Sequence, residues 1–298
     1  IYREKKDFRN LSSTLQILLT HETDQDERVR LMTQAAELAE TNLRNPMAAF
    51  DQLQRVVHEA PNNKDAREAF LRLGSTLDQW GTVHDVLLDA MHRLDDDDDR
   101  IQVQLTLGRI LDEEMHAQDD ALNQFQSVLD TDSTNMTALN AVESLFSRSG
   151  RWYDLLAILE QKITLLDDEA DQLAVMRQQA RIHDEQLSDA MAAIDAYRAI
   201  LSLNEADSDA LDALQRLLSS TEQYDDLRDI LDLQLELALE SEENDGVLRY
   251  RLALADVLLR HLASIDDGIH QLRLIIDDEP QHPQARQMLD SFLNQPDG

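Results

Sequence analysis

Apolar residues recur at helical spacing along the whole chain. In one stretch, Leu155, Ile158, Leu159 and Ile163 follow the i, i+3, i+4, i+8 spacing of a single helix face. Short polar breaks that contain good capping residues, such as Asp207-Ser208, separate this and similar segments. No stretch alternates strictly between apolar and polar residues, as a half-buried strand would. The pattern therefore predicts an all-α fold.

The helical pattern repeats along the chain with a 72-residue period. An aromatic residue marks the period at Phe8, Trp80, Trp152 and Tyr224. A small residue marks it again at Ala66, Ala138, Ala210 and, three residues late, Ala285. Periods of this kind are typical of repeat proteins, in which neighbouring repeats supply each other's core. We predict a single array of about sixteen antiparallel helices in four tandem units, which cover residues 8–79, 80–151, 152–223 and 224–298.

The last unit is longer than the others, and we place its three extra residues in the polar stretch 240–246. Phe8 fits the second helix of a repeat whose first helix would precede the chain, and residues 283–294 fit a first helix without its partner. We therefore expect the chain to be part of a longer protein. No apolar run approaches the roughly 20 residues that span a bilayer. We expect no membrane insertion and a soluble protein of the cytoplasm or periplasm.

Small and bulky residues follow a second pattern within each unit. A small residue late in one helix precedes an alanine, an aromatic residue four positions on and then a bulky apolar residue. The third unit reads Ala180, Ala193, Tyr197 and Ile200, and the second reads Gly108, Ala121, Phe125 and Val128. This pattern resembles the tetratricopeptide repeat, and each unit would hold two repeats of unequal length, a shorter one followed by a longer one.

The resemblance implies an α-solenoid, a right-handed superhelix of helix pairs that acts as a non-catalytic scaffold for a protein or peptide partner. It also implies that the first helix of each repeat lines the concave face and contacts that partner. On this basis the candidate partner-binding residues are Arg30, Glu37, Arg72, Arg109, Asp112, Arg177, Arg181, Asp184 and Arg216. The alternative is an architectural spacer in a larger protein, without a ligand of its own.

Arg109 and Arg181 recur at the 72-residue step. A guanidinium group at this place could hold a carboxylate of the partner through two parallel hydrogen bonds. An ion pair with a neighbouring helix of the same chain is the simpler interpretation, and we favour it.

The chain is strongly acidic, with a formal net charge of −33. Such a field repels nucleic acid and anionic lipid, and it favours a basic partner. Asp is also preferred over Glu although it is the poorer helix former, so an all-helical chain gains nothing locally from that choice. Excess Asp with few Lys is therefore equally compatible with a bacterial protein adapted to a salty or marine setting, where salt screens the repulsion.

Residues that would carry chemistry are missing or badly spaced. The chain has no Cys, none of its His residues forms the H-E-x-x-H pair of a zinc protease, and no glycine-rich phosphate loop is present. The five consecutive aspartates from Asp95 to Asp99 are expected to form a solvated loop rather than a cation site, since like charges repel and hydrate. We predict no enzyme, no cofactor and no metal site.

Overall fold

The structure is a computed structural model that describes residues 7–293, and within this range it contains sixteen α-helices, two π-helical turns and no strand. The chain divides into two compact units, residues 1–151 (unit 1) and 152–298 (unit 2), so that the division falls between the second and third of the 72-residue sequence units. The all-α helical repeat expected from the sequence is confirmed.

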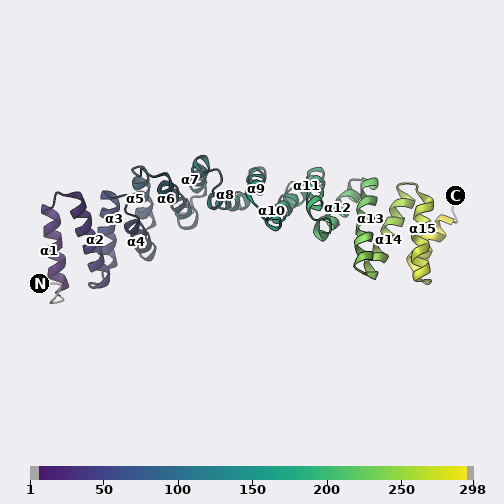
Figure 1. Cartoon of the computed structure of the whole chain (residues 1–298), viewed down its shortest axis with the longest axis horizontal. Coiled ribbons are helices and arrows are strands. Elements are labelled where there is room, and N and C mark those ends of the chain that lie inside the picture. Colours follow the sequence, from purple (N-terminus) through teal and green to yellow (C-terminus); the bar gives the residue numbers. More distant parts are fainter. Residues whose placement is uncertain (1–6, 294–298) are drawn as a thin grey trace. The chain divides into compact units, whose positions relative to one another are not determined.

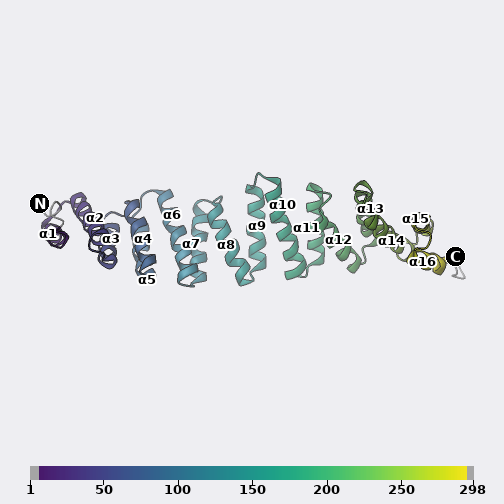
Figure 2. The ribbon, with the colours of Figure 1, turned by 90° about the horizontal axis from the view of Figure 1, so that it is seen from below.

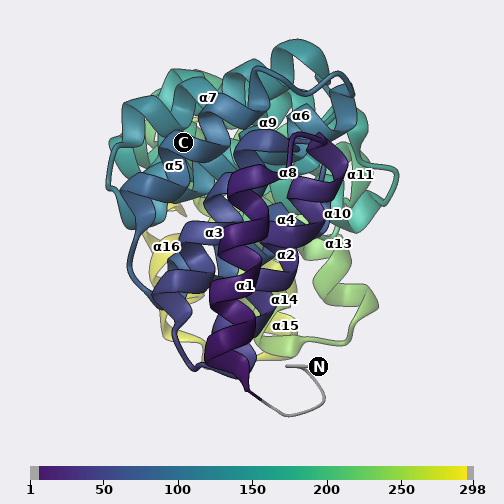
Figure 3. The ribbon, with the colours of Figure 1, turned by 90° about the vertical axis from the view of Figure 1, so that its left-hand side faces the viewer.

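Unit 1 contains α1 (Phe8–His21), α2 (Gln25–Thr41), α3 (Pro46–Glu59), α4 (Lys64–Thr76), α5 (Trp80–Met91), α6 (Asp97–Arg109), η1 (Ile110–Glu114), α7 (Gln118–Thr131) and α8 (Met136–Ser149). Each helix packs mainly against the next one along the chain, and α3 also packs against α5. Figure 1 shows this succession in purple to teal, and Figure 3 shows α1, α2 and α3 side by side from the α1 end.

Unit 2 contains α9 (Trp152–Leu165), α10 (Glu169–Arg181), η2 (Ile182–Gln186), α11 (Ala190–Leu203), α12 (Ser208–Ser220), α13 (Tyr224–Glu240), α14 (Asn244–Arg260), α15 (Ile265–Asp278) and α16 (Pro283–Leu293). Here too, consecutive helices pack on one another, and Figure 2 shows α9 to α12 as neighbouring rods. The π-turns η1 and η2 extend α6 and α10 at the same register of the sequence repeat.

Left-handed backbone marks the turn after every even-numbered helix from α2 to α14. The residues with positive φ in these turns are Arg44, Asp78, His116, Gly150, Ser188, Glu222 and Ala263. The separation between successive turns alternates between a shorter and a longer step, and the last step, from Glu222 to Ala263, is three positions longer than the earlier long ones. The structure therefore alternates between short and long helix pairs as the sequence does.

An additional left-handed residue, Glu242, lies between α13 and α14. Helix α13 has 17 residues, whereas α5, which occupies the same register in unit 1, has 12. Glu243 precedes α14 as Asp96 precedes α6, once the three extra residues are allowed for. Helix α9, at the same register, has 14 residues, and the connections after α9 and α13 are equally long. The three extra residues therefore lengthen the end of α13, which reaches Glu240, and the placement of the insertion in the polar stretch 240–246 is wrong.

Aspartates begin many of the helices. The side chains that accept a backbone N–H at a helix N-terminus include those of Asp7, Asp24, Asp96, Asp168, Asp189 and Asp207. Capping by Asp stabilises a helix by about 1 kcal/mol. The expectation that Asp brings no local gain is therefore wrong, because Asp suits the N-cap position better than Glu does.

The run from Asp95 to Asp99 is not a loop throughout, contrary to expectation. Asp96 accepts the backbone N–H of Asp99 at 2.9 Å, and Asp97–Asp99 form the first turn of α6. Negative charge is favourable there because the first turn is the positive end of the helix dipole.

Candidate functional site

Ion pairs link successive even-numbered helices in unit 1 and link the α10–η2 segment to α12 in unit 2. We call the side that the even-numbered helices of each unit share the even-helix face. In unit 1 the pairs are Glu40–Arg72, Arg67–Asp99 and Asp112–Arg148, which link α2 to α4, α4 to α6 and η1 to α8. In unit 2 they are Arg177–Asp207, Arg181–Asp209 and Asp184–Arg216, which link the α10–η2 segment to α12 and its N-cap. Most of the predicted partner-binding residues therefore lie in links between helices.

One of these links recurs with the sequence period. The acids Glu40, Asp112 and Asp184 follow one another at the 72-residue step, and each pairs with an arginine of the next even helix. The hydrogen bond from Arg72 holds the pKa of the Glu40 carboxyl below its ordinary value, although burial opposes this shift. Pairs on the surface of this kind each add less than about 1 kcal/mol to the free energy of unfolding. Their main effect is therefore to align the helices.

Arg177 has a structural role in unit 2. Its Nε donates to the Asp207 carboxylate at 3.0 Å, and Asp207, only 4% exposed, also accepts the backbone N–H of Ala210 at 3.0 Å. The buried carboxylate thus caps α12 and is neutralised by α10. This arrangement needs no external partner.

Arg30 and Glu37 lie apart from the other predicted residues. Arg30 pairs with Glu27, one turn earlier on the same helix, and this contact raises the pKa of the Arg30 guanidinium. Glu37 is exposed and borders a small hollow of about 160 Å³ between α1 and α2, together with Phe8 and Leu15.

Arg109 and Arg181 occupy the same register but differ in their environment. Arg181 pairs with Asp209 at 3.1 Å. In unit 1 the residue that corresponds to Asp209 is Thr137, and no described residue forms an ion pair or side-chain hydrogen bond with the exposed Arg109. The intramolecular pairing that we favoured from the sequence therefore holds for Arg181 only.

Arg109 borders an open groove of about 550 Å³ between α6 and α8. The Phe125 ring of α7 contributes apolar surface to the groove, and the Asp112–Arg148 pair also lines it. On the α8 side, Thr137, Asn140 and Ser144 make no side-chain hydrogen bond to any described residue. The groove therefore offers one unpaired cation and several unused hydrogen-bonding groups beside apolar surface.

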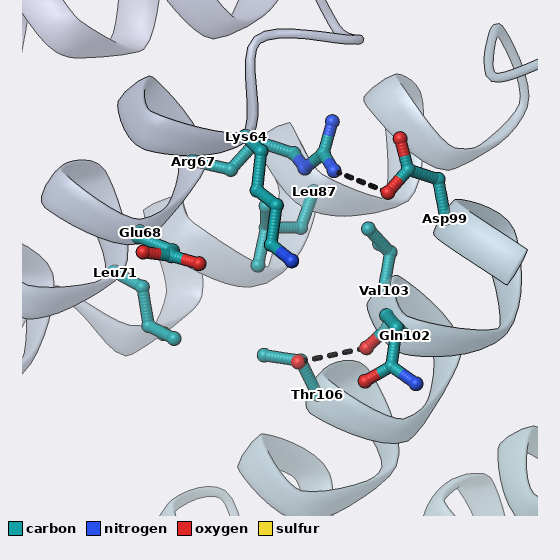
Figure 4. Close-up of a pocket in the computed structure, with 9 residues that line it drawn as sticks. All are labelled: Lys64, Arg67, Glu68, Leu71, Leu87, Asp99, Gln102, Val103 and Thr106. Carbon is teal, nitrogen blue, oxygen red and sulfur yellow. Dashed lines mark hydrogen bonds and ion pairs between the residues drawn. The ribbon is translucent and has the colours of Figure 1, made fainter.

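The space between α4 and α6 is closed by an ion pair (Figure 4). Arg67, only 7% exposed, reaches Asp99 at 3.2 Å and donates to the carbonyl oxygen of Pro61. A hollow of about 230 Å³ remains beside this pair, and Lys64 extends over it. We call the Arg67–Asp99 pair the clasp. Sequence reasoning missed it because Arg67 does not recur at the repeat period, although Asp99 recurs once, as Asp171.

A larger hollow of about 570 Å³ lies between α12 and α14 in unit 2. Its wall includes Leu211 and Asp212 of α12, Gln234 and Leu237 of α13, and Tyr250 of α14. The predicted partner-binding residues include none of these, although the insertion beside them was a signal that the repeat is altered here. Among the described residues, no group of three or more His, Asp or Glu side chains could hold a metal ion, and no helix is long and apolar enough to cross a membrane.

Small residues allow the two helices of a pair to approach closely. A Cβ atom on Gly108 would lie 2.7 Å from the Phe125 ring, and Ala180, at the same register, is fully buried in one core cluster with Tyr197. These contacts recur in helix pairs of alternating length. The chain therefore has a helix-pair repeat that resembles the tetratricopeptide repeat. The small-residue columns of this tetratricopeptide-like chain are therefore packing positions.

Neither a protein-family model nor a curated protein matches the sequence. Solved structures with a similar fold include the C-terminal part of a TPR repeat-containing protein from Cytophaga hutchinsonii, at 13% identity and a TM-score of 0.42, with 85% of this chain and 98% of that chain covered. A tetratricopeptide repeat protein from Parabacteroides merdae is 16% identical, with a TM-score of 0.36 and coverage of 76% and 79%.

YrrB, described as a TPR protein with an unusual peptide-binding site, is 14% identical, with a TM-score of 0.35 and coverage of 68% and 97%. These TM-scores are below 0.5, so the fold assignment rests on the helix pairing of the chain itself.

Proposed function

We propose that this tetratricopeptide-like chain is a non-catalytic protein-interaction scaffold that binds a protein or peptide partner on its even-helix face. The observation that carries the proposal is the unpaired Arg109 in the open groove between α6 and α8. The other predicted arginines, in contrast, are paired within the chain. A groove with a free cation, unused amide and hydroxyl groups and some aromatic surface suits an extended peptide, whose backbone needs donors and acceptors along its length.

The charge of the chain adds a second preference. With a net charge of −33, the protein attracts a partner of opposite sign from a distance and repels nucleic acid. A partner that is basic overall, and that places one carboxylate or carbonyl group against Arg109, satisfies both the long-range field and the local groove.

Site-specific photo-crosslinking in the cells that make the protein would test this proposal. One crosslinking residue replaces Asn140 in the groove, and a matched one replaces the exposed Gln126 on the other side of the same unit, on α7. We expect a discrete crosslinked protein from position 140 but not from position 126. Its yield should fall at least five-fold in Arg109→Met.

Equal crosslinking from both positions would contradict the proposed groove and favour the architectural spacer. A crosslinking yield at position 140 that is unchanged in Arg109→Met would do the same. Circular dichroism of each variant checks that the helices are retained. Arg181→Met is the matched control, since it removes an arginine of the same register that already has an intramolecular partner.

A further inference from the structure

The hollow between α12 and α14 occupies the same register as the clasped space between α4 and α6. Counting forward by two 72-residue periods, Leu211 corresponds to Arg67, and Gly246 corresponds to Asp99 once the three-residue insertion is included. The space between α12 and α14 therefore lacks both partners of the clasp. The hollow is correspondingly larger, about 570 Å³ compared with about 230 Å³.

A polar side chain has replaced an apolar one at the base of this hollow. Gln234 corresponds to Ala90 in unit 1 and is 3% exposed. Its Nε2 donates to the Asp212 carboxylate at 3.3 Å, but its Oε1 has no hydrogen-bond partner. A buried acceptor without a hydrogen-bond partner is destabilising, so a glutamine here is unfavourable unless a donor reaches it.

The hollow has an excess of negative charge. Asp212, Glu240 and Glu243 line it, and the only described cation among its lining residues is Arg249. Arg249 lies against Tyr250, whose hydroxyl accepts from its guanidinium at 2.7 Å and whose ring lies 4.6 Å from it. The hydrogen bond to Tyr250 and, less strongly, the charges of Glu243 and Asp212 raise the pKa of this guanidinium, so the two carboxylates are partly compensated. Apolar surface from Leu211, Leu237 and Ala238 completes the wall.

We infer that the hollow between α12 and α14 binds an arginine side chain of a partner, with the methylene stem on the apolar wall and the guanidinium between Asp212 and Gln234. The guanidinium offers five N–H donors in one plane, enough to pair with the carboxylate and to satisfy the free amide oxygen after a small rotation of the Gln234 side chain. This second contact point extends the proposed function, because it lies on the even-helix face of the other unit.

The test uses the full chain and a small probe, the tripeptide acetyl-Gly-Arg-Gly-amide. The same tripeptide with citrulline is the control, since citrulline keeps the shape of arginine but has no charge. Two-dimensional NMR follows the side-chain amide signals of Gln234 during titration. We expect saturable shifts with the arginine peptide and at least three-fold weaker binding with the citrulline peptide. Equal binding of the two peptides, or no shift at Gln234, would overturn the inference.

A double variant supplies the structural control. Leu211→Arg with Gly246→Asp rebuilds the clasp of unit 1 in unit 2 without changing the net charge. A Cβ atom on Gly246 would meet only the flexible end of the Glu243 side chain, at 2.9 Å, so the substitution can be accommodated. We expect this variant to keep its helical circular dichroism and to lose the binding. Undiminished binding to the folded variant would also overturn the inference.

Two further variants separate this site from the groove of unit 1. Gln234→Ala restores the residue found at the same register in unit 1, and we expect at least a three-fold loss of affinity for the arginine peptide. Arg109→Met should leave this affinity unchanged. A crosslinking result that contradicts the groove would therefore leave the tripeptide titration able to support or refute the arginine site on its own.

Discussion

The helix pairs α4–α5 and α12–α13 occupy the same register of the repeat, yet they present different surfaces. The first is joined to α6 by an ion pair between the buried Arg67 and the half-buried Asp99, whereas the second borders an open hollow beside α14. The packing positions between paired helices change little, since small residues must remain where helices touch. Residues on the even-helix face are under no such constraint, so the two units share a skeleton and differ in what they can bind.

The N-caps of α4 and α12 are expected to give the largest difference in stability between the two units. Asn63 and Asp207 lie at the same register, and each caps its helix, but only Asp207 also neutralises an arginine of the preceding even helix. We expect Asp207→Ala to lower the free energy of unfolding by about 2–3 kcal/mol, because it removes the cap and leaves the half-buried Arg177 without a counter-charge.

Asn63→Ala removes a cap alone, and we expect a loss of about 1 kcal/mol. Urea unfolding followed by circular dichroism measures both variants. Equal losses would show that the Arg177–Asp207 pair adds nothing to the cap.

Substitution at the close helix contact of Gly108 is expected to give the next largest change in the free energy of unfolding. In Gly108→Ala the new methyl group would lie 2.7 Å from the Phe125 ring, so the helices of this pair must separate. We expect a loss of about 1–2 kcal/mol in urea unfolding, since overpacking outweighs the gain in helix propensity. Gly81→Ala is the matched control, because nothing lies within 4 Å of its Cβ position. That variant should be unchanged or more stable.

The two units also differ in the residue that occupies one of the left-handed turns, and we expect a smaller change in stability there. Gly150 and Glu222 occupy the same register of the repeat, and both have positive φ, 67° and 59°. A side chain in this conformation costs about 1 kcal/mol. We therefore expect Glu222→Gly to raise the thermal midpoint and Gly150→Ala to lower it. A fall in the midpoint of Glu222→Gly would mean that the glutamate contributes a contact that outweighs the strain.

Removal of the Glu40–Arg72 ion pair is expected to give the smallest change in the free energy of unfolding, and this change depends on pH. Because the hydrogen bond to Arg72 lowers the pKa of Glu40 in the folded state, the pair stabilises the protein above the ordinary glutamate pKa. Its contribution disappears as the pH falls through the lowered value. We expect Arg72→Met to cost less than about 1 kcal/mol at pH 7 and nothing at pH 2. A difference between variant and wild type that persists at pH 2 would point to packing instead.

The helices and their repeat were predictable because the residues that form them recur. Glycine and alanine columns and apolar helical spacing are local properties, so the 72-residue period shows them directly. Arg109 and Arg181 show where this reasoning ends. The two arginines occupy the same position of the repeat. Whether each forms an ion pair within the chain depends on a second repeat position, which is Thr137 in unit 1 and Asp209 in unit 2. Reading both positions together would have separated the two arginines.

The clasp and the hollow were beyond the reach of the sequence for a different reason. Arg67 and Asp99 come from successive even-numbered helices. No feature of either helix alone indicates that the two side chains form an ion pair. Likewise, Gln234 reads as an ordinary polar position of α13, and its burial follows from the placement of α12 and α14 around it. Such sites depend on three helices at once.

The three extra residues before α14 have a practical consequence. They lengthen α13, while a short exposed connection from Ser241 to Glu243 joins this helix to the next helix pair. Connections of this type accept additional chain readily. A fluorescent label inserted genetically after Glu242 would border the hollow between α12 and α14, so its signal in living cells would report on what occupies that hollow.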